Sequence, residues 1–300
     1  MQRQLTPDTV IEVGYVGNVG HKLQIWTMGN YPLPGPGDVQ SRRPYPELGV
    51  VQVADHAGNS VYNSASLKLE RRFFHGFTYL VSYTLSRSID DGSSIRAHIG
   101  ETDFPQNIYN RTDRRGLSAF NQTQRLATSV LWEPPIGRGK RLDLGRFGNA
   151  LAGDWQAGTI LAARSGQPFT VTTGVDGPNT GYSGYPFPNA TGLSTVPPNG
   201  KDPQQYFNPA AFAMPPPFTY GNSARNNVIA PEQVNWDFST MKNFAMPIEG
   251  HRLQFRFEAF NFPNRPNFGL PNSTMISASF TKIISTSAMR QLQFSLKYVF

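Results

Sequence analysis

The sequence predicts an all-β protein, namely an antiparallel transmembrane β-barrel segment with about eight full strands, a stub of a further strand and long extracellular loops. Three observations support this prediction. Apolar and polar residues alternate along most strand-like segments, short and long connections alternate between these segments, and the composition excludes membrane-spanning helices.

The composition limits the fold class. Of the 300 residues 38% are hydrophobic, the mean hydropathy is −0.40, and no stretch approaches the roughly 18 to 20 consecutive apolar residues of a transmembrane helix. The 28 glycines and 25 prolines favour strands joined by turns. The absence of cysteine excludes a disulfide scaffold and a cysteine-based metal site.

The last eleven residues, 290–300 (RQLQFSLKYVF), show the clearest strand pattern. Every second residue is apolar and the chain stops on an aromatic residue. This alternation predicts a strand with one apolar and one polar face. It suits the last strand of an outer-membrane barrel, although the last strand of a soluble β-sandwich alternates as well.

Three of these terminal residues have a second interpretation. Phe294, Tyr298 and Phe300 match the kind of C-terminal signature that the barrel assembly machinery reads on its substrates. The physical basis is strand addition, in which an exposed edge pairs with an open sheet edge and alternate side chains give specificity. The alternative is that the three aromatic residues only meet lipid in the interfacial girdle.

The remaining strands follow in chain order. A stub covers 1–5, and the alternation is clean at 11–15, 64–70, 77–86 and 252–258. The segments 122–133, 154–172 and 233–246 have strand composition with a looser pattern, in which Leu131 and Ile160 fall on the side that should be polar. The apolar faces are predicted to meet lipid, and the polar faces, with Lys68 and Arg256 among others, to line a water-filled interior.

The connections strengthen this interpretation. Those at 6–9, 74–76 and 247–250 are short, whereas those at 89–120, 173–232 and 263–288 are long and rich in Gly, Pro, Asn and Ser. A barrel predicts short periplasmic turns and long extracellular loops, and this order places the end of the last strand on the periplasmic side. The connection at 134–152 breaks the rule, since it should be a short turn.

The beginning of the sequence bears on completeness. Residues 1–8 contain no apolar core of a secretory signal, which an outer-membrane protein needs. We therefore expect the C-terminal piece of a longer barrel, unless the chain is no barrel. Eight strands can close a small barrel, but the size of the loops suits part of a wider one.

A series of short runs resembles TonB-dependent outer-membrane receptors of the Oar-like type, in the order of the C-terminal half of that family. The runs are 2–17 (QRQLTPDTVIEVGYVG), 62–72 (YNSASLKLERR), 82–90 (SYTLSRSID), 165–171 (SGQPFTV), 206–212 (YFNPAAF), 220–225 (YGNSAR) and 257–269 (FEAFNFPNRPNFG). The resemblance implies a 22-stranded barrel filled by an N-terminal plug in the intact receptor. Residues 1–300 then form the C-terminal part of that barrel, with no plug domain.

The resemblance also implies function and partners. The intact parent would bind an extracellular ligand, of unknown identity, and import this nutrient using TonB energy, contacting TonB only through its N-terminal part. The expected partners are outer-membrane lipid, lipopolysaccharide and the barrel assembly machinery. Two alternatives are a small passive barrel of porin or adhesin type and a soluble, secreted β-sandwich binding module.

No residue pattern indicates an enzyme or a cofactor. The five histidines (21, 56, 75, 98 and 251) include no pair spaced for zinc on a helix, and Gly137–Lys140 lacks the spacing of a phosphate-binding loop. Asp90 and Asp91, with Glu101 or Asp103, could hold calcium, but a solvated pair of loop carboxylates is the simpler interpretation. The net charge of +7 is spread along the chain, so we expect no nucleic-acid partner.

The long connection 173–232 carries five aromatic residues. Such side chains can capture a ligand at the extracellular mouth, or they can pack the loop against its neighbours. The sequence leaves both open for Tyr182, Tyr185, Phe187, Tyr206 and Phe207.

Overall fold

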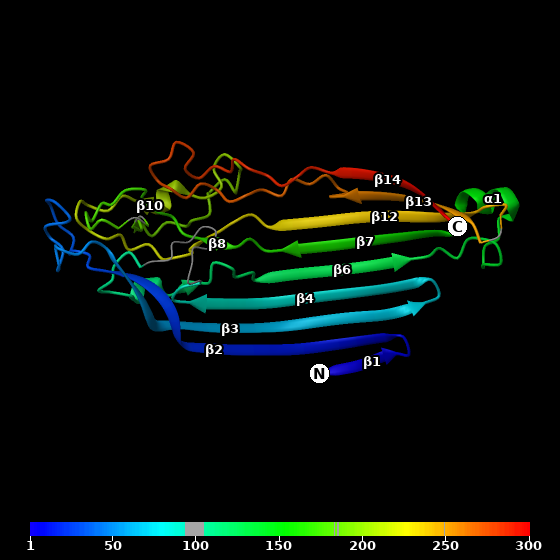
Figure 1. Ribbon diagram of the computed structural model, residues 1–300, viewed down its shortest axis with the longest axis horizontal. Helices are drawn as coiled ribbons and strands as arrows, with labels where there is room; N and C mark the ends of the chain where they lie inside the picture. Colours follow the sequence, from blue (N-terminus) through cyan, green and yellow to red (C-terminus); the bar gives the residue numbers. More distant parts are fainter. Residues whose placement is uncertain (94–104, 183, 185, 249) are drawn as a thin grey trace.

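One antiparallel sheet runs along the long axis of the molecule in the computed structural model (Figure 1). The structure describes residues 1–93, 105–182, 184, 186–248 and 250–300. The strand order is β1-β2-β3-β4-β6-β7-β12-β13-β14, so each full strand of the sheet lies beside its neighbours in sequence. The eight full strands and the N-terminal stub confirm the predicted fold class.

The elements have the following bounds. The main sheet comprises β1 (Gln2–Thr6), β2 (Thr9–Gly29), β3 (Val51–Phe74), β4 (Phe77–Asp90), β6 (Gln124–Trp132), β7 (Trp155–Arg164), β12 (Gln233–Ala245), β13 (Arg252–Phe260) and β14 (Gln291–Val299), with β5 (Gly116–Leu117) beside β4. Short pairs are formed by β8 (Pro168–Phe169) with β11 (Val228–Ile229) and by β9 (Asn189–Ala190) with β10 (Phe212–Ala213). The helices are α1 (Gly145–Ala152) and two 3-10 turns, Thr112–Arg114 and Pro209–Ala211. Within the described ranges, no helix is long and apolar enough to cross a membrane.

The register of the ladder sorts the side chains onto two faces. Residues directly opposite each other on antiparallel strands point to the same side of the sheet. Leu296 lies opposite Phe255, and Phe257 lies opposite both Phe294 and Thr240. Followed across the sheet, this pairing gives one apolar face, which includes Ile11, Val13, Tyr15, Leu67, Leu69, Tyr79, Val81, Tyr83, Leu126, Val130, Leu161, Trp236, Phe238, Leu253, Phe255, Phe257, Leu292, Phe294, Leu296 and Tyr298.

The opposite face is mainly polar. It includes Glu12, Ser66, Lys68, Glu70, Ser82, Thr84, Arg125, Ser129, Gln156, Asp237, Ser239, Asn243, Gln254, Arg256, Glu258, Gln293, Ser295 and Lys297. Leu131 and Ile160 interrupt it, as the sequence predicted: Leu131 lies opposite Thr78, and Ile160 lies opposite Asp237. The two faces therefore differ in the way that lipid on one side and water on the other require.

The short connections all lie at one end of the sheet, together with α1 and the C-terminus (Figure 1). The turn between β3 and β4 consists of His75 and Gly76, with φ of 52° and 77°. Two central residues with positive φ make a type I′ turn, whose twist matches that of the strands it joins. The long connections gather at the opposite end and form a loop layer, here residues 30–50, 91–93, 105–123, 165–182, 184, 186–232 and 261–290 with the short elements they contain.

Strands β2 and β3 are longer than the sequence pattern indicated. They contain 21 and 24 residues, whereas about 9 to 11 residues of a tilted strand cross a bilayer. The clean alternation stops near Gly17, and the register becomes irregular between Gly20 and Ile25. Beyond that point the two strands stay paired and extend past the part of the sheet with one apolar face, so they reach into the loop layer.

Strand β7 is shorter than predicted. It ends at Arg164, although strand composition continues to residue 172. A side chain at Gly166 would lie 1.7 Å from the backbone oxygen of Ala230, so the two backbones approach too closely there for any residue with a Cβ. This close approach turns the chain out of the sheet and into the loop layer.

The hydrophobic core lies in the loop layer rather than beneath the sheet. Phe207 is at its centre, with ring centroids 5.8 Å from Phe169, 6.0 Å from Phe212 and 5.2 Å from Phe280. The buried residues of this loop core are Phe169, Val171, Tyr206, Phe207, Ala211, Phe212, Val228, Ala230 and Ile283. A second cluster of Met28, Tyr31 and Tyr182 joins the end of β2 to the long connection. The loops therefore fold as a packed layer.

The loop core generates a stability prediction. We expect Phe207→Ala to destabilise the loop layer by about 3–5 kcal/mol, because a buried phenyl ring is lost and a cavity remains. Leu193→Ala is the matched control, since Leu193 is an exposed residue of the same connection. Hydrogen exchange at β8 and β11 measures the effect, and equal protection in the two variants would contradict the assigned core.

Candidate functional site

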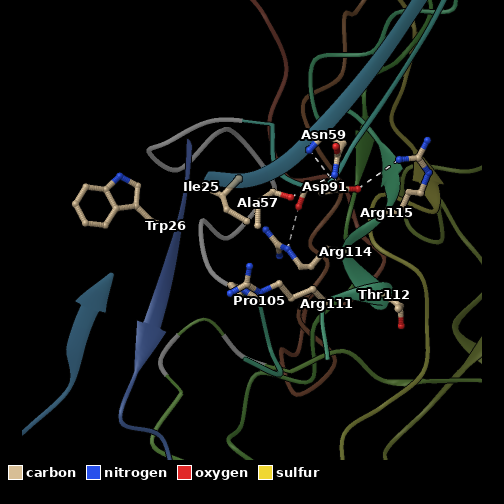
Figure 2. Close-up of a pocket in the computed structure, with 10 residues that line it drawn as sticks. All are labelled: Ile25, Trp26, Ala57, Asn59, Asp91, Pro105, Arg111, Thr112, Arg114 and Arg115. Atoms are coloured by element: carbon tan, nitrogen blue, oxygen red, sulfur yellow. Dashed lines mark hydrogen bonds and ion pairs between the residues drawn. The ribbon is translucent and has the colours of Figure 1, made fainter. Parts of the chain in front are cut away.

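A pocket of about 410 Å³ opens where the extended ends of β2 and β3 meet the loop layer (Figure 2). Its walls come from three parts of the chain, which the strand order brings to one corner of the sheet. The lining residues are Ile25 and Trp26 from β2, Ala57 and Asn59 from β3, and Asp91, Pro105, Arg111, Thr112, Arg114 and Arg115 from the segments that follow β4.

The pocket is positively charged. The Arg111 guanidinium lies 2.5 Å from the Asp55 carboxylate, and that of Arg115 lies 3.6 Å from Asp91. Each guanidinium has five N–H donors, more than a single carboxylate can accept. Among the described residues, three arginines line the pocket and two carboxylates, Asp91 and Asp55, lie on them, so the described lining carries more positive than negative charge.

Hydrogen bonds from Asn59 and Arg114 hold Asp91 in place. Its Oδ2 accepts hydrogen bonds from the Asn59 backbone N–H at 3.0 Å and from Asn59 Nδ2 at 2.9 Å. Its backbone oxygen accepts one from Arg114 Nε at 3.3 Å. These contacts fix the carboxylate at the end of β4, where it orients the pocket arginines and offsets part of their charge.

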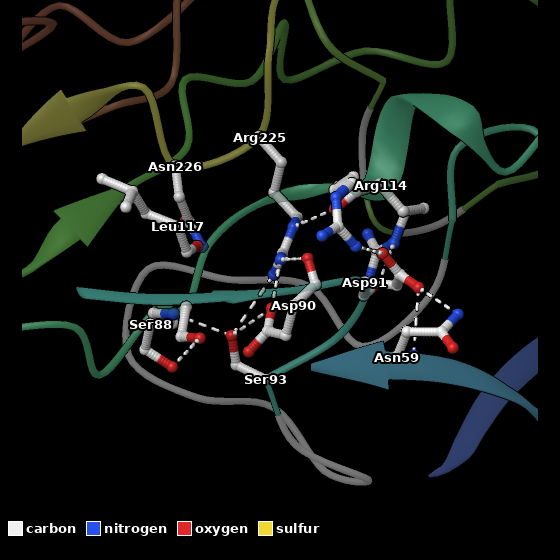
Figure 3. Close-up of polar contacts among 12 residues, drawn as sticks. Asn59, Ser88, Asp90, Asp91, Ser93, Arg114, Leu117, Arg225 and Asn226 are labelled. Atoms are coloured by element: carbon white, nitrogen blue, oxygen red, sulfur yellow. Dashed lines mark hydrogen bonds and ion pairs between the residues drawn. The ribbon is translucent and has the colours of Figure 1, made fainter. Parts of the chain in front are cut away.

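A buried ion pair between Arg225 and Asp90 lies next to the pocket and holds the backbone of the pocket residue Arg114 in place (Figure 3). The Arg225 guanidinium donates to the Asp90 carboxylate, to the Asp90 backbone oxygen at 2.7 Å and to the Arg114 backbone oxygen at 2.6 Å. Arg225 is 2% exposed and Asp90 is 3% exposed. The adjacent Asn226 donates to the Leu117 backbone oxygen at 2.7 Å. The connection 165–232 is thereby attached to the end of β4 and to the pocket segment.

Burial in the loop layer also shifts the pKa values of an aspartate and two tyrosines. Desolvation raises the pKa of Asp113, although a hydrogen bond from Gln106 at 2.7 Å opposes the shift. Desolvation raises the pKa of Tyr206 and that of Tyr220 to about 12, so both phenols stay neutral at physiological pH. Gln106 also donates to the Gly221 backbone oxygen and accepts from the Phe187 N–H, joining three loop segments.

The structure changes the interpretation of Asp90 and Asp91, which the sequence suggested as a solvated pair of loop carboxylates. Asp90 is not a solvated loop carboxylate, because the buried Arg225 neutralises it, and Asp91 is occupied by Asn59 and Arg115. Glu101 and Asp103 lie outside the described residues, as does His98. In the part of the chain that is described, no three metal-ligating side chains gather.

The aromatic residues of the long connection pack the loop. Tyr182, Phe187, Tyr206 and Phe207 are each at most 7% exposed, so they are not ligand-capturing side chains on a mobile loop. Tyr185 lies outside the described residues. The sequence analysis missed the pocket residues Trp26, Arg111 and Arg115. The sequence signal near them is the pair of adjacent arginines, Arg114 and Arg115, which does not indicate a pocket.

Phe294 and Tyr298 lie on the apolar face of β14, which is an edge of the sheet, and Phe300 follows the last residue of that strand. Phe294 is 65% exposed and Phe300 is 89% exposed. Tyr298 is hydrogen-bonded to His251, with 2.5 Å between its hydroxyl and Nδ1. The surface that β14 presents is therefore an unpaired edge with exposed aromatic side chains, and its role as an assembly signal stays a prediction.

Comparisons with known proteins agree with this architecture. The family model of the outer membrane beta barrel domain matches residues 1–293. The crystal structure of the outer membrane transporter YddB from Escherichia coli matches with a TM-score of 0.51 and 9% identity, over 98% of this chain and 31% of that chain. This chain thus spans about a third of that transporter, and at this identity the likeness concerns the fold alone. No curated protein matches.

The buried ion pair generates a second prediction. We expect Arg225→Met to destabilise the loop layer by about 3–5 kcal/mol, because it leaves the Asp90 charge buried without its partner. Arg265→Met is the matched control, since it breaks the exposed pair with Glu232 and costs about 0–1 kcal/mol. Limited proteolysis of the connection 165–232 reports the difference, and equal cleavage rates would refute it.

Proposed function

Because the chain belongs to the family of outer membrane beta barrel domains, we propose that it is the C-terminal barrel part of a TonB-dependent receptor of the Oar-like type. The protein resides in the outer membrane, where its apolar face meets lipid. The intact receptor binds a nutrient outside the cell and imports it using TonB energy. Its partners are then lipopolysaccharide, the barrel assembly machinery and, through a further part of the parent protein, TonB.

The observation that supports this proposal most directly is the packed loop layer with a cationic pocket at one end of the sheet. Preformed sites lose less conformational entropy when they bind a ligand than mobile loops do. The residues at the pocket are binding groups, and we expect no catalysis there.

The charge of the pocket indicates the class of ligand. Arg111 and Arg115 present planar donors that suit a carboxylate or a phosphate, and Ile25 adds an apolar surface (Figure 2). We therefore expect an anionic ligand with an apolar or aromatic part.

Uptake from the medium tests the transport function. Culture medium is compared, by mass spectrometry, after growth of cells that contain the intact receptor, cells without it, and cells without TonB. We expect at least one anionic compound to be consumed only where both proteins are present. Consumption that persists without TonB would identify a passive pore, and no receptor-dependent consumption would exclude transport.

Variants at the pocket test the assigned site. Arg115→Gln should weaken binding of the consumed compound about tenfold, because one charge-assisted hydrogen bond is lost. Lys282→Gln is the control, since Lys282 is an exposed cation of the same loop layer outside the pocket. Titration of receptor-containing outer membranes measures both, and unchanged affinity in Arg115→Gln would place the ligand elsewhere.

The terminal aromatic residues generate a prediction about assembly. Replacing Phe300 with Ala should lower the amount of folded protein in the outer membrane, because the assembly machinery loses one of its recognised side chains. Leu292→Ala removes another apolar residue of β14 that is not part of the signature. Heat-modifiable mobility on gels quantifies the folded form. Equal losses in both variants would reduce Phe294, Tyr298 and Phe300 to lipid contacts.

A further inference from the structure

The connection between β6 and β7 contains the helix α1 and lies at the end of the sheet opposite the loop layer (Figure 1). Its length is unexpected for a periplasmic turn of a barrel. Asp143 stabilises the beginning of the helix: Oδ1 accepts the Gly145 N–H at 3.0 Å and Asn149 Nδ2 at 2.6 Å. These hydrogen bonds, that from Asn149 first, lower the pKa of the Asp143 carboxyl. The helix is thus maintained by its own local contacts at neutral pH.

Helix α1 is attached to the lipid-facing side of the sheet. Lys242 lies opposite Trp155 and Phe255, which places it on the apolar face. Its ammonium donates to the backbone oxygens of Asn149 and Ala150, at 3.0 and 2.8 Å, and Trp155 Nε1 donates to that of Leu151 at 2.8 Å. The carboxyl end of the helix carries partial negative charge, so a cation is favourable there. Lys242 is consequently 3% exposed although it belongs to the apolar face.

The other side of the helix is apolar and uncovered. Leu144, Phe147 and Leu151 follow the spacing of three and four residues that places side chains on one helical face. Phe147 is 85% exposed and Leu151 is 79% exposed. Removing side chains of this size from water is favourable, so an apolar environment would stabilise this face.

Cationic residues lie in α1 and in the segment before it. Arg138, Arg141 and Arg146 are exposed, and no carboxylate of the described chain lies within ion-pair distance of them. Lys140 is different, because it pairs with Asp154 at 3.1 Å. An apolar face flanked by arginines is the composition of a helix that lies in a membrane interface, where the arginines reach phosphate groups.

We propose that α1 is an interfacial anchor that inserts Phe147 and Leu151 into the periplasmic leaflet of the outer membrane, with Arg138, Arg141 and Arg146 on phospholipid headgroups. The occupant is lipid because the helix is attached to the face of the sheet that already meets lipid, so its apolar residues continue that surface. The inference depends on the membrane location of the chain and not on TonB-dependent transport.

Residues 1–300 contain no cysteine, so single labels can be placed in them once any cysteine elsewhere in the parent protein is replaced. Phe147→Cys and Leu151→Cys each carry an environment-sensitive fluorophore in the intact protein, reconstituted in phosphatidylcholine liposomes with phosphatidylglycerol and with iodide on both sides. We expect quenching by lipids that carry a nitroxide high on the acyl chain, and loss of quenching by iodide. Leu193→Cys provides the aqueous reference and Leu296→Cys the lipid reference.

Two results would overturn the proposal. Iodide quenching equal to that of Leu193→Cys would show that α1 lies in water, and protection from both iodide and nitroxide lipid would show that another protein covers it.

The headgroup contact has its own test. Removing phosphatidylglycerol should raise iodide quenching at Phe147→Cys, and replacing Arg138, Arg141 and Arg146 with Gln should abolish that lipid dependence, whereas Lys282→Gln should preserve it.

Discussion

The backbone hydrogen bonds of the sheet are the constraint on which the rest of the structure depends. In lipid no water is available to pair with N–H and C=O groups, so neighbouring strands must satisfy them. The resulting antiparallel ladder fixes the register, and the register sends alternate side chains to opposite faces. The charged residues of the apolar face include Arg71, which pairs with Asp8, and Lys242 beneath α1, both at the end of the sheet with the short turns, and Arg87 toward the loop layer.

The loop layer solves a different physical problem. Outside the membrane the backbone is not held by a ladder, and the long connections order themselves around an aromatic core and a few buried polar contacts. The ion pair of Arg225 and Asp90 matters most among these, because it attaches the loop layer to the end of β4. The same arginine binds the backbone beside the pocket, so the geometry of the pocket depends on the folding of a segment more than 100 residues away.

The sequence predicted those parts of the protein in which one local rule applies. Period-two alternation identified the strands of the main sheet, because each residue of such a strand faces either the apolar or the polar side. It also identified Leu131 and Ile160 as apolar residues on the polar face. It did not identify the extensions of β2 and β3, where both faces contact protein or water and the alternation disappears. The pocket and the site of α1 were missed, and packing of the loop was only one of two alternatives, since each depends on contacts between segments that have no fixed spacing in sequence.

The packed loop layer has a consequence for how the cell surface is recognised from outside. Residues near 169, 207, 228 and 283 lie together in one core, so the exposed surface above them is assembled from separate parts of the chain. An antibody or a bacteriophage that recognises this surface therefore meets a discontinuous epitope. Such a binder would lose its target when the chain is denatured, and short synthetic peptides copied from single loops would be poor immunogens for the native form.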